Sequence, residues 1–449
     1  FGLSSRGLGD VYKRQGKYGE RFQRRLLGQE SGLDHWSSGA WLALTKYRAI
    51  AAALAIQGHH IGLQRGDNGS LAGLDPGKLV NHHPLGLRLS TADLERTLEL
   101  ACHDGLIFSS PSTRAISSWD KPTAAMLDVG LLFSCVVDAE FLDTEAHFVG
   151  YAQGKRPRRP GPRLDPEAAL LALERYMNNG IRSGVPSQAV VREARESLWQ
   201  ACTQSAQAPI GGFTLTAPTG SGKTLAMLKL ALEHARHHGL KRIVLAVPFL
   251  TIIEQTAQIY RAIFADFPEH FVLEHHSLAG LGVETVQGDA QPPLERERRL
   301  LSENWDAPVV ITTNVQLLES LFSNRPSACR KLHNLMESVI LFDEAQSLPA
   351  PLAVPTLATL SHLSAAYRSS VVFATATQPA FDSLHDAVSR YAASGWQPVE
   401  VVPNHPALFA ALQRVHVIWP KPGETHTWNG LADELRDIPQ ALVVVNLKR

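Results

Sequence analysis

The sequence predicts a multidomain protein in which an all-α domain precedes an α/β domain with a mostly parallel sheet. Residues 16–151 carry helical patterns, and a basic, Pro-rich segment at 152–164 then marks a domain boundary. After a helical lead-in at 165–208, strand and helix patterns alternate from residue 209 to residue 395. This alternation is typical of a parallel sheet covered by helices. The pattern restarts in residues 396–449, which we expect to begin a further α/β domain.

Composition limits the class of protein. The 449 residues suffice for two or three domains. Lys plus Arg and Asp plus Glu both number 43, so contact with nucleic acid has to come from local basic patches. The four cysteines lack zinc or disulfide spacing, which indicates a reducing cytoplasm. The sequence shows neither a run of about 18 apolar residues nor a secretory signal, so we expect no contact with a membrane.

Both ends of the sequence predict a fragment of a longer protein. The chain does not begin with Met, and residues 1–15 have no convincing periodicity, so we expect them to be a leader foreign to the gene. At the other end, strands are predicted at 399–402, 414–418 and 441–446, and the chain stops partway through this pattern. We therefore expect truncation at both ends.

Within the helical region, Asp34 or Ser37 is predicted to cap a helix, and Arg48–Gln57 is an apolar, alanine-rich helix. Further helices are predicted at 91–103, 123–145, 165–178 and 187–203. The helix at 123–145 places Asp138 on an apolar stripe, where a carboxylate is costly unless it is paired or binds a metal. A salt bridge or a position at the edge of the stripe explains Asp138 better than a metal does, if the residues alone are considered.

Residues 212–239 combine a strand, a glycine-rich loop and a helix that ends at Gly239. The loop reads Ala-Pro-Thr-Gly-Ser-Gly-Lys-Thr, and its position between strand and helix is that of a phosphate-binding loop. Its first glycine is replaced by alanine, and a glycine-rich turn without a ligand is the alternative. We predict that ATP contacts Ala217, Pro218, Thr219, Gly220, Ser221, Gly222, Lys223 and Thr224. In this site Lys223 reaches the β- and γ-phosphates and Thr224 ligates Mg²⁺.

A second acidic site is needed for the Mg²⁺ that accompanies ATP. Residues 338–346 supply an apolar strand that ends in Asp343 and Glu344. Such a pair alone is usually a helix N-cap, but beside a phosphate-binding loop it predicts hydrolysis. Asp343 then holds the metal through water and Glu344 polarises the attacking water. The predicted catalytic residues are thus Lys223, Asp343 and Glu344.

A third strand, at 371–375, ends in Thr375-Ala376-Thr377. This is similar to the Ser/Thr-Ala-Thr motif that couples the nucleotide to nucleic acid in superfamily 2 helicases. With the two motifs above, in this order, residues 209–395 resemble the first RecA-like domain of such a helicase. The resemblance implies that the segment from Pro248 to Gln255, including Glu254, lines the path of nucleic acid. Polar residues after another strand, at the sheet's carboxyl edge, are further candidates to hydrogen-bond phosphates: Thr312, Thr313, Asn314 and Gln316.

Histidines in the helical region extend the resemblance. His59 and His60 are adjacent and would point about 100° apart on a helix, which suits two neighbouring metals. Gly16-Lys17, His35, His59-His60 and Asp138, ahead of this motor, resemble the CRISPR-associated helicase–nucleases of type I systems. The resemblance implies an HD-type nuclease domain in residues 16–151. Its metal ligands would be His35, His59, His60 and Asp138, and the ion would be Mn²⁺, Fe²⁺, Co²⁺ or Ni²⁺.

The resemblance implies an ATP- and Mg²⁺-dependent motor that moves on single-stranded DNA and feeds a metal-dependent nuclease. A guide-RNA surveillance complex of the Cascade type recruits the enzyme in antiviral defence. The family carries a His-Asp dyad before its Gly-Lys, whereas Lys13-Arg14-Gln15 stands here. We therefore expect a half-built metal site that binds metal weakly. We also expect poor ATP hydrolysis by the chain itself, because hydrolysis needs an arginine from the second RecA-like domain, of which the sequence holds only the beginning. A helicase without nuclease activity and a non-catalytic module that binds ATP and single strands are the alternatives.

Overall fold

The computed structural model describes residues 15–91, 93–105, 120–150, 157–181, 189–276, 293–417, 419, 423 and 427–444. The predicted leader up to residue 14 and the first part of the basic connector, residues 152–156, lie outside the described residues. In the part of the chain that is described, no helix combines the length and hydropathy that crossing a bilayer requires.

A seven-stranded sheet forms the centre of the larger domain, in the order β5-β6-β4-β7-β8-β3-β9, and each of its pairings is parallel. Parallel strands place all their carboxyl ends at one edge, which is where ligands bind in α/β proteins. The strands are β3 (Gly212–Thr216), β4 (Arg242–Val247), β5 (Val272–His275), β6 (Val309–Thr313), β7 (Ser338–Asp343), β8 (Ser370–Thr375) and β9 (Val399–Glu400).

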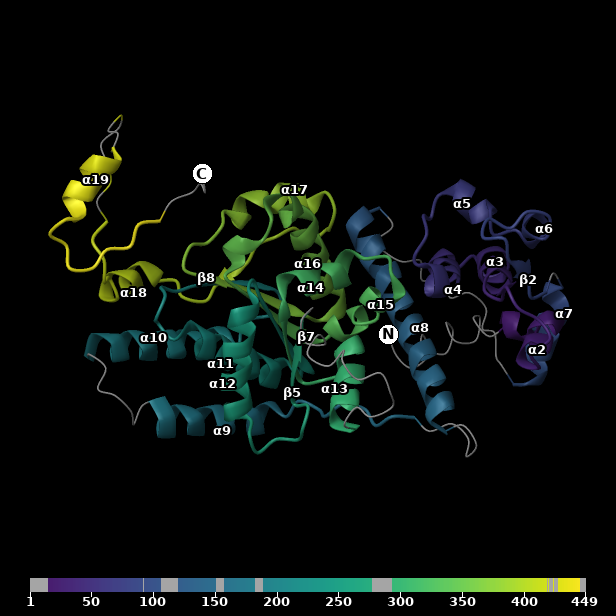
Figure 1. Cartoon of the computed structure of the whole chain (residues 1–449), viewed down its shortest axis with the longest axis horizontal. Coiled ribbons are helices and arrows are strands. Elements are labelled where there is room, and N and C mark those ends of the chain that lie inside the picture. Colours follow the sequence, from purple (N-terminus) through teal and green to yellow (C-terminus); the bar gives the residue numbers. More distant parts are fainter. Residues whose placement is uncertain are drawn as a thin grey trace.

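Helices cover both faces of this sheet (Figure 1). Side chains of β4 show how the faces divide: Ile243 and Leu245 join one buried cluster, whereas Val244 and Ala246 join the other. Successive residues of a strand point to opposite faces, so a strand buried on both sides is apolar throughout. The first cluster includes α9 (Pro166–Tyr176), α10 (Ala189–Ser205), α11 (Lys223–His238) and α12 (Leu250–Ile263). The second includes α13 (Pro293–Asn304), α14 (Asn314–Phe322), α16 (Ala353–Tyr367) and α17 (His385–Ser389).

The N-terminal region is helical, as predicted. It also holds a small parallel pair of strands, β1 (Leu33–Asp34) and β2 (Arg88–Leu89). Asp34 fixes the start of α3, because its Oδ1 accepts hydrogen bonds from the backbone N–H groups of Trp36 and Ser37 at 2.8 and 2.9 Å. The helices are α2 (Glu20–Leu26), α3 (Ser37–Thr45), α4 (Ile50–Ile61), α5 (Asn68–Ala72), α6 (Pro76–Leu79), α7 (Leu94–His103) and α8 (Pro122–Gly150).

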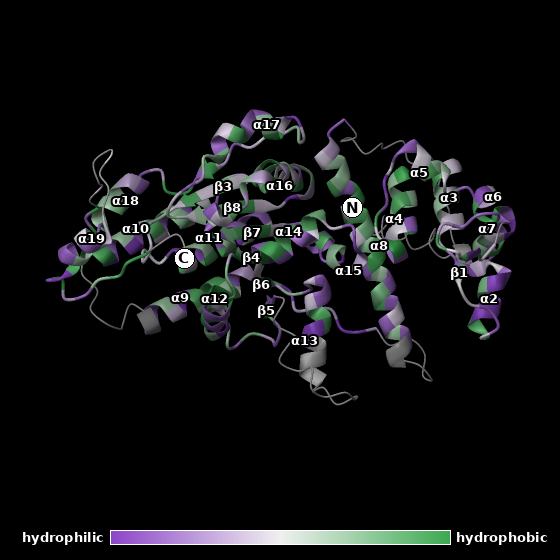
Figure 2. Cartoon of the chain, turned by 45° about the horizontal axis from the view of Figure 1, so that its top comes forward, coloured by the Kyte–Doolittle hydropathy of each residue, from purple (hydrophilic) through white to green (hydrophobic). Residues whose placement is uncertain are grey.

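The long helix α8 lies between the N-terminal helices and the α/β domain (Figure 1). Leu127 and Leu131 are buried in the same cluster as the sheet side chains Val310 and Ile340. Phe133, further along the helix, is fully buried in a cluster with Ala55 of α4. A helix that is apolar on opposite sides has to be covered on both, so α8 belongs to the cores of both regions. Figure 2 shows hydrophobic residues along α8 where it meets these neighbours.

We predicted that a second α/β domain begins at residue 396, but the first strand after that residue belongs to the first domain. β9 pairs with β3, so Val399 and Glu400 belong to the first sheet, and Trp396 is buried in its core. The Glu400 carboxylate explains the pairing, because it accepts hydrogen bonds from the backbone N–H and the hydroxyl of Thr216 at 3.1 and 2.7 Å.

The strands predicted at 414–418 and 441–446 are not formed in residues 414–417 and 441–444, which are the described parts of those ranges. Val415 and Leu442 are 70% and 89% exposed, and an apolar strand needs a neighbour that buries it. The structure has α18 (His405–Ala411) and α19 (Trp428–Leu435) in this part of the chain.

Candidate nucleotide and metal sites

The phosphate-binding loop leaves the carboxyl end of β3 and enters α11. Gly220 and Gly222 have φ angles of 80° and 86°, a region that a residue with a side chain rarely adopts. Ala217 is not among the described non-glycine residues with positive φ, and it is fully buried. Its backbone N–H donates to the Thr375 carbonyl of β8 at 3.1 Å. The alanine at the first position of the motif therefore fits the loop, since that position does not need the freedom of glycine.

The other predicted loop residues differ in their burial. Pro218 and Ser221 are buried beneath the loop, and Thr219 is exposed on it. Thr224 is partly buried in the first turn of α11, after Lys223. A helix start of this kind presents unpaired N–H groups and the positive end of the helix dipole.

Lys223 meets both predicted carboxylates at the end of β7. Its Nζ lies 2.7 Å from Glu344 Oε1 and 3.0 Å from Asp343 Oδ1, and Lys223 and Asp343 are buried. Burial acts to raise the pKa of Glu344, but hydrogen bonds from Lys223 and Gln346, with the charge of Lys223, outweigh it and lower the pKa. The structure thus brings together the three predicted catalytic residues, with two carboxylates against one ammonium.

A chain of hydrogen bonds leads from this site to the end of β8. Gln346 Nε2 donates to Glu344 Oε2 at 2.7 Å, and the Thr375 hydroxyl donates to Gln346 Oε1. Thr377 N–H in turn donates to Thr375 Oγ1 at 3.1 Å, and Thr377 is exposed. Hydrogen bonds therefore connect Glu344 to the exposed Thr377, through the side chains of Gln346 and Thr375 and the backbone N–H of Thr377.

The residues predicted to contact nucleic acid are placed differently from one another. Pro248 is partly buried after β4, and Glu254 and Gln255 are exposed on α12. Thr312 is fully buried and its hydroxyl donates to the His275 carbonyl at 2.8 Å. The hydroxyl of Thr312 thus forms a hydrogen bond between the neighbouring strands β6 and β5.

The neighbouring polar residues are also engaged within the protein. Thr313 Oγ1 accepts from Gln316 N–H at 3.1 Å and caps α14, and Gln316 Nε2 donates to Glu319. Asn314 Nδ2 donates to Ser347 Oγ at 2.9 Å. Each of these residues thus makes a hydrogen bond within the protein, although Asn314 Oδ1 is buried without a partner among the described residues.

Three predicted metal ligands converge at the start of α3 and the end of α4. His35, His59 and His60 each offer a ring nitrogen, and these atoms lie within 4.8 Å of one another. His35 Nε2 and His60 Nε2 are 3.1 Å apart. His59 Nδ1 lies 2.6 Å from the Ile56 carbonyl, which makes Nδ1 the protonated nitrogen and Nε2 the donor for a metal. The histidine part of the predicted site is therefore assembled.

The prediction that Asp138 completes this site is wrong. Asp138 is not part of the histidine group, and its carboxylate faces the α/β domain. Arg330 Nε donates to Asp138 Oδ1 at 2.7 Å, and Asn304 Nδ2 lies 3.2 Å from both carboxylate oxygens. The charge of Asp138 is balanced by Arg330, which is the salt-bridge explanation that its place on an apolar stripe favoured.

The charged connector also has internal partners. Arg158 Nη1 lies 3.7 Å from Glu145 of α8, and Gly161 N–H donates to Asp306 at 2.9 Å. The described part of the connector, from residue 157, thus packs against both regions and has a structural role.

Sequence reasoning missed Arg195, Arg414 and Glu400, all of which contact the region of the phosphate-binding loop. Arg195 Nη2 donates to the Gly220 carbonyl at 3.2 Å. A β-carbon built on Gly220 would lie 3.2 Å from the guanidinium of Arg414. None of the three belongs to a motif, and only their positions in space relate them to the loop.

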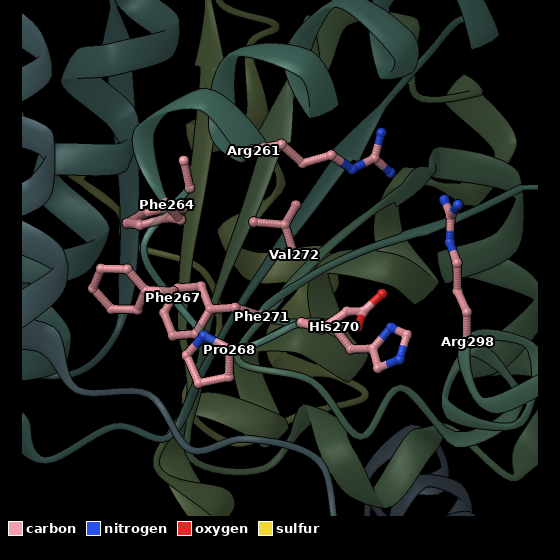
Figure 3. Close-up of a pocket in the computed structure, with 10 residues that line it drawn as sticks. Arg261, Phe264, Phe267, Pro268, His270, Phe271, Val272 and Arg298 are labelled. Carbon is pink, nitrogen blue, oxygen red and sulfur yellow. The ribbon is translucent and has the colours of Figure 1, made fainter. Parts of the chain in front are cut away.

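A cavity of about 370 Å³ opens beside the edge strand β5, away from the carboxyl ends of the strands (Figure 3). Phe264, Phe267 and Phe271 pack on one side, and Arg261 and Arg298 extend from the other. Glu274 pairs with both arginines, at 2.6 and 3.4 Å, so each guanidinium has an acidic partner within the protein.

Sequence comparisons relate the α/β domain to helicases. Residues 199–385 match the sequence profile of the DEAD/DEAH box helicases. The CRISPR-associated nuclease/helicase Cas3 of Haloferax volcanii is 30% identical over 291 residues, which are 61% of this chain and 29% of that protein. The resemblance to CRISPR-associated helicases that the motifs predicted is confirmed.

Solved structures show the same fold. Crystal structures of T. fusca Cas3 with ATP and of a CRISPR-associated protein superpose with TM-scores of 0.53 and 0.50, each at 19% identity. The superposed regions cover 86% and 93% of this chain, and 44% and 48% of the chains in those two structures. The chain thus spans less than half the length of the relatives that it matches.

Proposed function

We propose that this chain binds ATP with Mg²⁺ and forms the nucleotide-binding part of a motor that couples ATP hydrolysis to movement on single-stranded DNA. The contact of Lys223 Nζ with Asp343 and Glu344 carries the proposal, because it places a cation and two carboxylates beside a phosphate-binding loop. When ATP binds, Lys223 turns from the carboxylates to the phosphates. Asp343 would then hold the hydrated Mg²⁺, and Glu344 would orient the attacking water.

Coupling to DNA would use the hydrogen bonds between Glu344, Gln346 and Thr375. If the Glu344 carboxylate moves toward the attacking water, Gln346 loses its acceptor and Thr375 its partner. The loop after β8 then changes at Thr377, which is exposed. This is a mechanical link between the nucleotide and a surface that nucleic acid can reach.

Substitution at the loop tests ATP binding. Lys223→Ala removes the cation that neutralises phosphate charge, so calorimetry should detect no ATP binding. Asp343→Asn should weaken Mg²⁺-dependent binding more than Mg²⁺-free binding. Lys46→Ala, an exposed lysine of the N-terminal region, is the matched control. Unchanged ATP affinity in Lys223→Ala contradicts the assignment of the loop.

From the resemblance to CRISPR-associated helicases, we propose single-stranded DNA as the substrate of this chain and a guide-RNA surveillance complex as its partner. A guide-RNA surveillance complex would expose a displaced DNA strand, on which the motor would load. Stimulation of ATP hydrolysis by single-stranded DNA, compared with duplex DNA and single-stranded RNA, tests the substrate. ATP binding without hydrolysis on any of them would instead identify a non-catalytic module.

A second activity, metal-dependent cutting of DNA, is favoured by the three histidines. His35 and His60 fit one ion, because nitrogen donors that share a transition metal at about 2.1 Å lie about 3 Å apart, as these two do, and a nitrogen of His59 lies within 4.8 Å of both. A bound divalent metal would activate water for attack on a phosphodiester. Asp34 does not serve as a ligand, because its oxygens are engaged by Trp36, Ser37 and His83. The site therefore offers imidazoles alone among the described residues.

Metal binding and cutting are tested with Mn²⁺, Fe²⁺, Co²⁺ and Ni²⁺. His35→Ala and His60→Ala should abolish the binding of the metal, measured by calorimetry, and any cutting of single-stranded DNA. His103→Ala, an exposed histidine on α7, should change neither. Metal binding that survives in His35→Ala and His60→Ala would contradict the proposed nuclease activity and leave only the proposed helicase activity.

A further inference from the structure

Two arginines lie against the loop that we assign to the phosphates of ATP. Arg195 comes from α10, before the motor strands, and donates from Nη2 to the Gly220 carbonyl at 3.2 Å. Arg414 follows α18, after β9, and its guanidinium borders the same glycine. Helix α10, which carries Arg195, packs against α18, which precedes Arg414. Two cations from segments far apart in the sequence therefore meet at one position of the loop.

The charge of the site explains why cations are needed there. Lys223 faces two carboxylates, Asp343 and Glu344, and a third carboxylate, Glu400, accepts two hydrogen bonds from Thr216 at the base of the loop. This surplus of negative charge opposes the binding of a triphosphate, which is itself strongly negative. A single Mg²⁺ and Lys223 leave part of the charge of the phosphates uncompensated.

Both arginines are able to supply that compensation. Each side chain is exposed, and neither is paired with a carboxylate among the described residues. A guanidinium has five N–H donors in a planar fork, which suits two oxygens of a phosphate. Arg195 uses one hydrogen bond on the Gly220 carbonyl, as far as the described residues show, and this bond holds its head group at the rim of the loop.

We propose that Arg195 and Arg414 form a second cationic element of the nucleotide site, and that this arginine pair contacts the phosphate tail of a bound nucleoside triphosphate. The inference rests on the proposed ATP-binding function and adds two residues outside the helicase motifs. Arg195 is the principal member because its position is fixed by a hydrogen bond to the loop. Because the interaction is with phosphates, its strength should rise with the number of phosphates in the nucleotide.

Calorimetry on the 449-residue chain, with ATP, ADP and AMP in the presence of Mg²⁺, tests the arginine pair. Arg195→Ala removes a charge-assisted hydrogen bond to the phosphates, so it should weaken ATP binding about tenfold and ADP binding less, and leave AMP binding unchanged. Arg195→Lys should recover part of the ATP affinity, because it keeps the charge without the fork. Arg414→Ala should act in the same direction as Arg195→Ala, and the double variant should lose more ATP affinity than either.

Arg192→Ala is the matched control, because it removes an exposed arginine one turn earlier on α10. Equal ATP affinity of Arg195→Ala and Arg192→Ala, in a chain whose ATP binding is abolished by Lys223→Ala, overturns the arginine pair alone. An equal loss for ATP, ADP and AMP overturns the phosphate contact and assigns Arg195 to the shape of the loop. ATP binding that survives in Lys223→Ala overturns the proposed function itself.

Discussion

The ion pair between Asp138 and Arg330 should determine how firmly α8 is attached to the α/β domain. Both side chains are buried, at 8% and 2% exposure, and Arg330 Nε donates to Asp138 Oδ1 at 2.7 Å. Asp138→Ala leaves Arg330 inside the protein with Glu303 as its remaining carboxylate. Removing one member of a buried pair costs about 3–5 kcal/mol, because the other charge stays buried without compensation.

The expected loss of stability is at the lower end of that range. Glu303 remains bonded to Arg330 Nη1, and the guanidinium lies 4.7 Å from the centre of the Phe141 ring. Both interactions continue to stabilise the charge, so we expect Asp138→Ala to lower the free energy of unfolding by about 3 kcal/mol. Asp138→Asn keeps an oxygen acceptor for Arg330 and should cost less.

Urea denaturation followed by tryptophan fluorescence measures this change, since the chain has eight tryptophans. Asp437→Ala, an exposed carboxylate, is the control and should change stability by less than about 0.5 kcal/mol. A double-mutant cycle of Asp138→Leu with Arg330→Leu should give a coupling energy of about 2–3 kcal/mol.

Metal binding distinguishes the ion pair from the ligand role that the family resemblance implied for Asp138. Calorimetry with Mn²⁺ should give the same affinity for Asp138→Ala as for the wild type, because the histidine group does not include Asp138. If Asp138→Ala loses Mn²⁺ binding and its stability equals that of Asp437→Ala, Asp138 is a ligand and the reasoning from the ion pair is refuted.

Two further predictions follow from buried groups of the motor. Thr375→Val removes the hydroxyl that donates to Gln346. The stimulation of ATP hydrolysis by single-stranded DNA should then fall about tenfold or more, while ATP affinity changes less than about twofold. A parallel loss of stimulation in a steady-state assay and of affinity in calorimetry would argue against the coupling. Burial lowers the pKa of His234 from 6.5 to about 4, so only the unfolded chain takes up this proton as the pH falls from 6.5 toward 4. Stability should therefore be lost over that window, by about 2 kcal/mol between pH 7 and pH 5 for His234 alone. His234→Gln should show a smaller loss by urea denaturation at the two pH values, whereas an identical loss in the variant would exclude His234 as the source.

The parts of the fold and site that the sequence predicts are those set by local pattern. The phosphate-binding loop, Lys223 and the strand that ends in Asp343 lie where their motifs indicated, because the spacing of a strand, a loop and a helix start fixes their geometry. The three histidines also converge, through a family resemblance and not through any periodicity. In contrast, the β9 pairing depends on Glu400 and Thr216, which are 184 positions apart in the chain. No local pattern indicates an interaction of this kind.

Asp138 shows most clearly why the remaining interactions escaped prediction. Helical spacing placed Asp138 on an apolar stripe of α8. This position predicts that its carboxylate is buried, but it does not identify the neighbour that covers the stripe. The neighbour is the motor, whose Arg330 is 192 positions away. Two alternatives, a metal and a salt bridge, satisfy the same requirement that a buried charge be compensated. Only the packing of α8 against the motor selects one of them.

The position of α8 has a consequence for any coupling between the two proposed activities. On one side the helix packs against α4, which carries His59 and His60, and on the other it is held to the motor by Asp138. A second buried hydrogen bond, from the hydroxyl of Tyr367 to Asp128 at 2.6 Å, holds the first part of α8 to α16. Because α8 is anchored at two separate points along its length, it is held to the α/β domain along its length and not at one pivot. These two interactions therefore join the region of the histidine group, through α4 and α8, to the α/β domain.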